Sequence, residues 1–94
     1  MIEKIVILIM CHIIGDYILS TEFIATTKGE NWYHLFVHCV TYCIPFAILF
    51  GINTILLYIF CIHIVIDSLK SRYKIISYTQ DQIIHYLALL LYIL

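Results

Sequence analysis

The stretch Ile62-His63-Ile64-Val65-Ile66-Asp67-Ser68-Leu69-Lys70 carries His63 and Asp67, four residues apart, inside an apolar run with Lys70 near its end. The run extends over about 54–72, a length that suits a helix crossing a membrane. Side chains at positions i and i+4 lie on one face of a helix, so His63 and Asp67 point in the same direction. Because ionisable groups are costly inside a membrane, this pair is expected to face partners within a bundle.

Three further apolar segments accompany this one. They cover about 5–24, 32–50 and 80–94. The three longer segments reach ~30 Å, the thickness of a hydrocarbon core, whereas the last is shorter and is expected to tilt or to stop within the bilayer. The sequence therefore predicts an all-α fold: a four-helix transmembrane bundle with antiparallel up-down topology, in a single integral membrane domain over residues 1–94.

The composition supports a membrane environment. Of the 94 residues, 64% are hydrophobic and only 12% are charged. A soluble domain of this size has too little interior to hide so much apolar surface, so membrane lipid is the expected partner. The net charge of −1 gives no basic footprint, and nucleic acid is not expected as a partner.

The basic residues predict an orientation. Lys28, Lys70, Arg72 and Lys74 flank the polar stretches 26–31 and 73–79, and only Lys4 lies at the other end of the segments. By the positive-inside rule, both polar stretches are expected to be cytoplasmic and both termini outside.

All five His and all three Asp residues fall into pairs with a spacing of four, one pair for each segment. The pairs are His12/Asp16, His34/His38, His63/Asp67 and Asp81/His85. In an antiparallel bundle all four pairs fall toward the cytoplasmic end, which predicts one shared interior site.

Imidazole and carboxylate side chains are ligands that suit zinc, iron or manganese, and zinc is the first choice. The predicted metal ligands are His12, His38, His63, Asp67 and His85. Asp16 or Asp81 is the predicted catalytic base. His34, Lys70 and Gln82 are expected to orient the metal ligands through hydrogen bonds or to contact the substrate. A hydrogen-bonded polar network that fixes helix register is the alternative to a metal site.

A metal site in such a bundle favours a metal-dependent hydrolase that acts on a lipid or lipid-linked phosphate, because a bound metal activates water. One alternative is a metal-ion transport component, which would require a homo-oligomer. The others are a b-type haem protein and a non-catalytic membrane accessory protein.

Several of these motifs also resemble a known family. They are His12-Ile-Ile-Gly-Asp-Tyr-Ile-Leu19, Lys28, His34 and His38, His63-Ile-Val-Ile-Asp-Ser-Leu-Lys70 and Asp81-Gln-Ile-Ile-His85. Together they resemble the bacterial and phage membrane proteins of domain-of-unknown-function family 3307. The resemblance covers nearly the whole chain and implies a small protein of a bacterial inner membrane or a phage-infected host membrane. One departure is Ser20, where the family usually has Gln.

Overall fold

In the computed structural model, which describes residues 2–93, the chain is all-α, as predicted. The elements are α1 (Ile2–Ile13), a π-helical turn η1 (Ile14–Ile18), α2 (Glu22–Thr27), α3 (Trp32–Phe50), α4 (Thr54–Ser71), α5 (Tyr78–Ala88) and a 3₁₀ turn η2 (Leu89–Tyr92). Two of them, α3 and α4, are long and apolar enough to cross a membrane. The sequence predicts four membrane-spanning helices, but among residues 2–93 only these two are long and apolar enough, so the all-α fold is confirmed and the four-helix transmembrane bundle is not.

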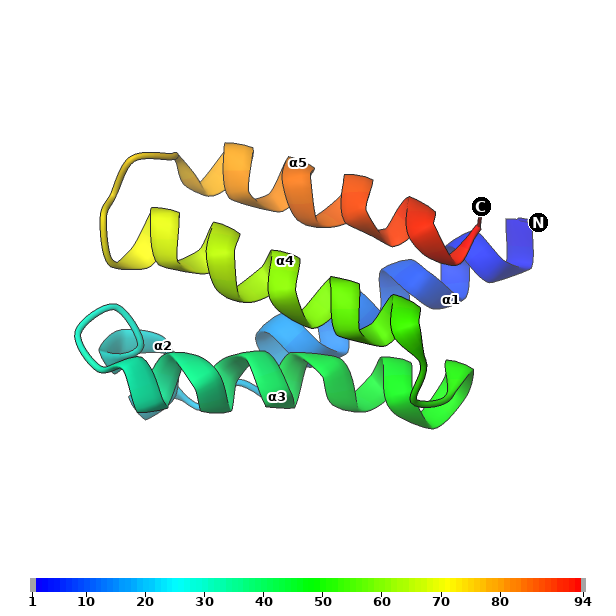
Figure 1. Ribbon diagram of the computed structural model, residues 1–94, viewed down its shortest axis with the longest axis horizontal. Helices are drawn as coiled ribbons and strands as arrows, with labels where there is room; N and C mark the ends of the chain where they lie inside the picture. The colour runs from blue at the N-terminus through cyan, green and yellow to red at the C-terminus, as the bar shows by residue number, and fades with distance from the viewer. Residues whose placement is uncertain (1, 94) are drawn as a thin grey trace.

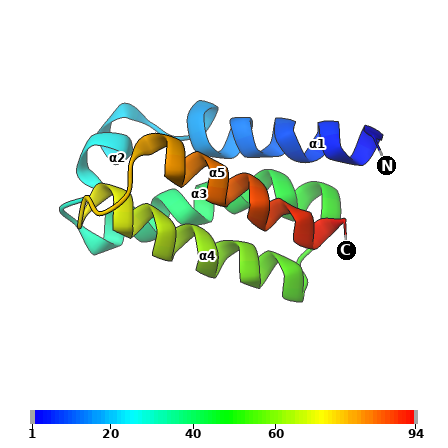
Figure 2. The same cartoon turned by 90° about the horizontal axis from the view of Figure 1, so that it is seen from above.

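The helices form an elongated bundle in which sequence neighbours run antiparallel (Figure 1). α3 packs against α4, and α4 packs against α5, while η1 and α2 pack on α3. Both ends of the chain lie at one end of the bundle, and the α4–α5 connection lies at the other, together with α2 (Figures 1 and 2). We call the latter the loop end.

The first apolar segment differs from the prediction of one helix over 5–24. Its α-helix starts at Ile2, passes into the π-turn at Ile14 and stops, and α2 then begins at Glu22. Thr21 ends the break as the N-cap of α2, because its Oγ1 accepts a hydrogen bond from the Ile24 amide at 3.2 Å. Part of the predicted 26–31 loop is therefore helical. The break carries the chain to the loop end, where it brings Lys28 back to the bundle.

Side-chain caps set the starts of the later helices. Asn31 accepts hydrogen bonds from the Tyr33 and His34 amides, so α3 begins at Trp32. Asn53 caps α4 in the same way, through the Leu56 amide. Ser77 forms a capping box with Gln80, which starts α5 two residues before the predicted boundary at 80.

The interior of the bundle divides into an apolar half and a polar half. The apolar half lies toward the chain termini and includes Leu8, Phe46, Leu56 and Tyr92. The buried ionisable residues lie nearer the loop end, on α1, α3, α4 and α5, together with Lys28 after α2. This division confines the costly charged groups to one end of a lipid-like interior.

Gly15 allows a close approach between the first segment and α3. A Cβ atom at this position would lie 2.5 Å from the Tyr42 carbonyl oxygen and 2.9 Å from the Tyr42 Cα. Gly15→Ala must therefore push η1 away from α3, and we expect it to lower the free energy of unfolding by about 1–3 kcal/mol. Thermal unfolding in mild detergent measures the change. Ile18→Ala, at an exposed position of the same turn, is the control, and equal effects of the two substitutions would contradict the close contact.

Candidate metal centre

Eight ionisable residues meet in the polar half of the bundle, and we call them the polar cluster. They are His12, Asp16, Lys28, His38, His63, Asp67, Asp81 and His85. Seven of them are buried, and the Asp16 side chain is 10% exposed. Polar groups at this depth persist only when they are paired with one another or with a bound ion.

His38 lies at the centre of the cluster. Its Nε2 atom is 3.0 Å from His63 Nε2 and 3.2 Å from Asp16 Oδ1. Asp67 Oδ2 lies 3.5 Å from the same nitrogen and Lys28 Nζ lies 3.4 Å from it. Since one imidazole nitrogen either donates one hydrogen bond or accepts one, protein hydrogen bonds cannot account for all of these close approaches.

Asp16, His38 and His63 form a group of three metal donors, which we call the donor group. Their donor atoms all lie within 4.8 Å of one another, and the third separation, from His63 Nε2 to Asp16 Oδ1, is 3.9 Å. Two ligands each ~2.0–2.1 Å from a tetrahedral metal lie about 3.3 Å apart. The three separations bracket this value, so the donor group fits a tetrahedral ion with a fourth position left for a non-protein ligand.

Aromatic contacts hold the His63 ring in place. The ring stacks on Tyr42 at a centroid distance of 3.9 Å and an interplanar angle of 12°, and it also stacks on His85 at 4.3 Å. His63 Nδ1 has no hydrogen-bond partner among the described residues. Packing therefore fixes the direction of Nε2 without the hydrogen bond that commonly orients a metal-bound imidazole.

His12 and Gln82 connect the donor group to α5. His12 Nδ1 lies 2.8 Å from the Tyr42 hydroxyl, and its Nε2 lies 2.9 Å from Gln82 Oε1. The Gln82 amide donates to Asp16 Oδ2 and to Asp81 Oδ2, each at 3.1 Å. Both nitrogens of His12 are thus engaged by protein groups, and Gln82 links His12 to the carboxylates of Asp16 and Asp81.

Asp81 and His85 form a separate pair beside the donor group. His85 Nε2 lies 3.2 Å from Asp81 Oδ1, and Lys70 Nζ approaches Asp81 Oδ2 at 3.8 Å. Lys70 also lies 3.9 Å from Asp67 Oδ1. Lys70 therefore bridges two carboxylates of the buried cluster, while its side chain remains 24% exposed.

The charges of this region do not balance. Three carboxylates, Asp16, Asp67 and Asp81, face two ammonium groups, Lys28 and Lys70. With neutral imidazoles one negative charge is left over, and an unbalanced buried charge is strongly unfavourable. A bound cation or a protonated histidine would supply the missing positive charge.

Lys28 was not among the predicted site residues. Its Nζ lies 3.0 Å from both oxygens of Asp67, although the residue follows α2 in what the sequence indicates as a surface loop. No four-residue spacing marks it, because the break at residues 19–21 brings it into the cluster from outside the helix. The Ser71 hydroxyl also donates to Asp67, at 3.1 Å. Asp67 is thus engaged mainly by protein donors.

His34 lies outside the cluster, contrary to the prediction that it supports the site. Its Nδ1 is 2.6 Å from the Thr27 hydroxyl, and its ring packs 5.0 Å from that of Phe23 on α2. The four-residue spacing with His38 does not bring both rings inward, since α2 covers the face that His34 occupies. Ser20 contributes instead, with its hydroxyl 3.3 Å from His38 Nδ1.

A pocket of about 740 Å³ opens at the loop end beside the donor group. Asp16 lines it directly, as do Ser20, Lys28 and Lys70. Of the donor group, Asp16 is therefore the member that a molecule in the pocket contacts.

The chain belongs to the family described as "Protein of unknown function (DUF3307)", whose family model matches residues 5–94. This confirms the resemblance seen in the sequence motifs. No curated protein and no solved structure matches the chain.

Proposed function

We propose that this DUF3307 protein is an integral membrane protein in which Asp16, His38 and His63 bind a divalent metal, and that it hydrolyses a lipid or lipid-linked phosphate. The observation that carries the proposal is the donor group itself, buried between helices with one member in an open pocket. Asp16 serves here as a ligand, where the sequence favoured it as a base.

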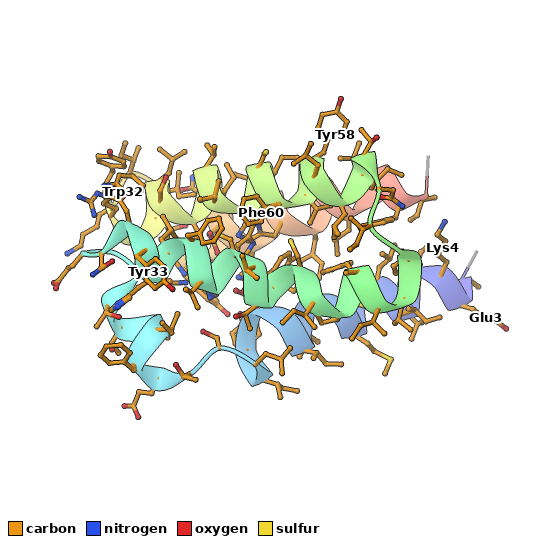
Figure 3. All side chains as sticks on the ribbon, turned by 60° about the horizontal axis from the view of Figure 1, so that its bottom comes forward. Glu3, Lys4, Trp32, Tyr33, Tyr58 and Phe60 are labelled. Atoms are coloured by element: carbon orange, nitrogen blue, oxygen red, sulfur yellow. The ribbon has the colours of Figure 1, made fainter. Side chains whose placement is uncertain are left out.

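The surface of the bundle supports placement in a membrane. Large apolar side chains such as Ile48, Leu49 and Leu57 are well exposed along α3 and α4. The bundle is 37 Å long, which matches a hydrocarbon core of ~30 Å with its interfaces. Trp32 and Tyr33 lie near the loop end, where aromatic belts occur, and Glu3 and Lys4 lie near the opposite end (Figure 3).

The proposed orientation puts the loop end in the cytoplasm and both chain termini outside. Lys28, Lys70, Arg72 and Lys74 gather at the loop end, where they line one pocket, whereas Lys4 belongs to the other end. This asymmetry agrees with the positive-inside rule. In the proposed orientation the donor group lies in the cytoplasmic half of the bilayer.

Two imidazoles and one carboxylate are a ligand set typical of catalytic zinc, with iron and manganese as the alternatives. When bound, such a metal polarises a phosphoryl oxygen and provides a nucleophilic water at neutral pH. The protein residues fix the geometry: Tyr42 stacking holds His63, and Gln82 holds Asp16. In the overall reaction, water cleaves a P–O bond, so the phosphorus gains a hydroxyl and the leaving alcohol gains a proton.

The neighbouring ammonium groups favour hydrolysis of an anion over metal-ion transport. Lys28 and Lys70 line the pocket through which the donor group is reached. Together with Arg72 and Lys74, which line the same pocket, they attract an anionic substrate. A transport component would need a path with the opposite charge.

Elemental analysis of detergent-purified protein tests the metal centre. We expect bound zinc, iron or manganese in the wild type and its loss in His63→Ala, because the substitution removes one of three protein ligands. His34→Ala is the matched control, as it removes a histidine of the same helix bundle that lies outside the cluster. It should keep the wild-type metal content.

Metal content that is equal in wild type, His63→Ala and His34→Ala would overturn the proposed centre. The same holds for a wild type that takes up no zinc at a stoichiometry near one in equilibrium dialysis. Either result would favour the accessory role, with the polar cluster as a register-fixing network.

A further inference from the structure

The pocket at the loop end is lined by more basic than acidic residues, and we call it the cationic pocket. Lys28, Lys70, Arg72 and Lys74 line it, against the two acidic residues Asp16 and Glu30. Hydroxyl groups contribute as well, from Ser20, Thr26, Ser71 and Tyr78. Ammonium, guanidinium and hydroxyl donors converging on one space are the groups that proteins use to bind phosphate.

Arg72 is held in a defined position at the wall of this pocket. Its guanidinium lies over the Trp32 ring at 4.2 Å, and Nη1 donates to the Gly29 carbonyl at 3.4 Å. A planar guanidinium fixed by stacking keeps donors available for a second, bidentate partner. No carboxylate of the described residues pairs with Arg72, so its positive charge is available to bind an external anion.

The backbone conformation of Lys74 is a second observation that indicates a binding site. It is the one non-glycine residue with a positive φ among residues 2–93, at 57°. Glycine or asparagine is favoured in this left-handed conformation, which commonly ends a helix. Lys74 is exposed and lines the pocket, so its ammonium group lies at the pocket rim. The left-handed backbone that puts it there costs conformational free energy for a non-glycine residue.

We infer that the cationic pocket binds a phosphate monoester. This inference rests on the proposed function, because the bound monoester would lie next to Asp16 at the edge of the pocket. A monoester carries up to two negative charges and three acceptor oxygens, which suits several cations around one space better than a singly charged diester does. The volume of about 740 Å³ admits a phosphorylated head group with its adjoining glycerol or sugar.

The single tryptophan gives a direct readout, because Trp32 is stacked on Arg72. The full-length protein in detergent, with chelator present, is titrated with short-chain phosphatidic acid, with glycerol 3-phosphate and with short-chain phosphatidylcholine. We expect Trp32 fluorescence to change with the two monoesters and not with the phosphatidylcholine. Tighter binding of phosphatidic acid identifies a lipid as the source of the phosphate, and equal binding of both monoesters identifies a soluble ester.

Lys74→Gly is the decisive variant, since glycine suits the left-handed backbone and the fold should tolerate it. We expect roughly tenfold weaker monoester binding from the loss of one charge-assisted contact, while Lys74→Arg retains binding. Lys4→Gly removes an equal charge at the far end and should leave the affinity unchanged.

Equal responses to phosphatidic acid and phosphatidylcholine, or wild-type affinity in Lys74→Gly, would overturn the inference. Since the titration is done with chelator, its result is independent of the metal centre. The His63→Ala analysis tests that centre separately, so the two failures are distinguishable.

Discussion

Replacing Lys28 by methionine is expected to lower the free energy of unfolding by about 3–5 kcal/mol, because the change leaves the buried Asp67 carboxylate without its closest cation. Lys28 Nζ lies 3.0 Å from both Asp67 oxygens, and Asp67 is 1% exposed. The remaining cation near Asp67, Lys70, is 3.9 Å away. Methionine is unbranched and only one atom shorter than lysine, so the change mainly removes the charge. Denaturation of metal-free protein in mixed micelles measures it.

The double variant Lys28→Met/Asp67→Asn separates the lost pair from a general packing defect. Asparagine removes the charge that Lys28 neutralises, so the double variant should be more stable than Lys28→Met alone. Lys4→Met, at an ammonium that lies 6.0 Å from the Phe50 ring at the opposite end, should change the stability by less than about 1 kcal/mol. If Lys28→Met lowered the free energy of unfolding no more than Lys4→Met does, the Lys28–Asp67 pair would not contribute substantially to stability.

The regular helices could be predicted from the sequence because their signals are local. α3 begins and ends where apolar composition, Asn31 and Gly51 indicate, and α4 begins after Asn53. The first segment could not be predicted in the same way. Its composition is mainly apolar, but a π-turn at Ile14–Ile18 and the Thr21 cap divide it, and close packing of Gly15 on α3 stabilises that geometry.

The part of the candidate site that lies on regular helices could be predicted from the four-residue spacing. Spacing alone brought His38, His63 and Asp67 toward a common interior, and the structure places all three there. It misassigned His34, because α2 folds over that face, and it omitted Lys28, which follows the break in the first segment. Where the chain leaves the regular helices, side-chain contacts depend on tertiary packing. The 3.6-residue period of a helix carries no information about that packing.

Asp16→Asn is the substitution with the largest expected effect on function. Asp16 is both a member of the donor group and the one member that lines the cationic pocket. Asparagine is nearly equal in size, so packing is preserved while the only anionic ligand of the proposed metal is lost. Removing an outer-sphere partner of a metal typically costs ~10–100-fold in affinity or activity, and loss of a direct anionic ligand should exceed that. Competition with a chromogenic chelator measures the zinc affinity.

Glu30→Gln is the matched control for Asp16→Asn, because it removes one negative charge from the same pocket without touching the donor group. If the effect of Asp16→Asn were simply electrostatic, both variants would shift zinc affinity and release of phosphate from short-chain phosphatidic acid to a similar extent. Direct ligation instead predicts a loss of more than ~100-fold for Asp16→Asn and little change for Glu30→Gln. Wild-type zinc affinity in Asp16→Asn would remove Asp16 from the centre, leaving two imidazoles that cannot by themselves make the three-ligand site that catalytic zinc requires.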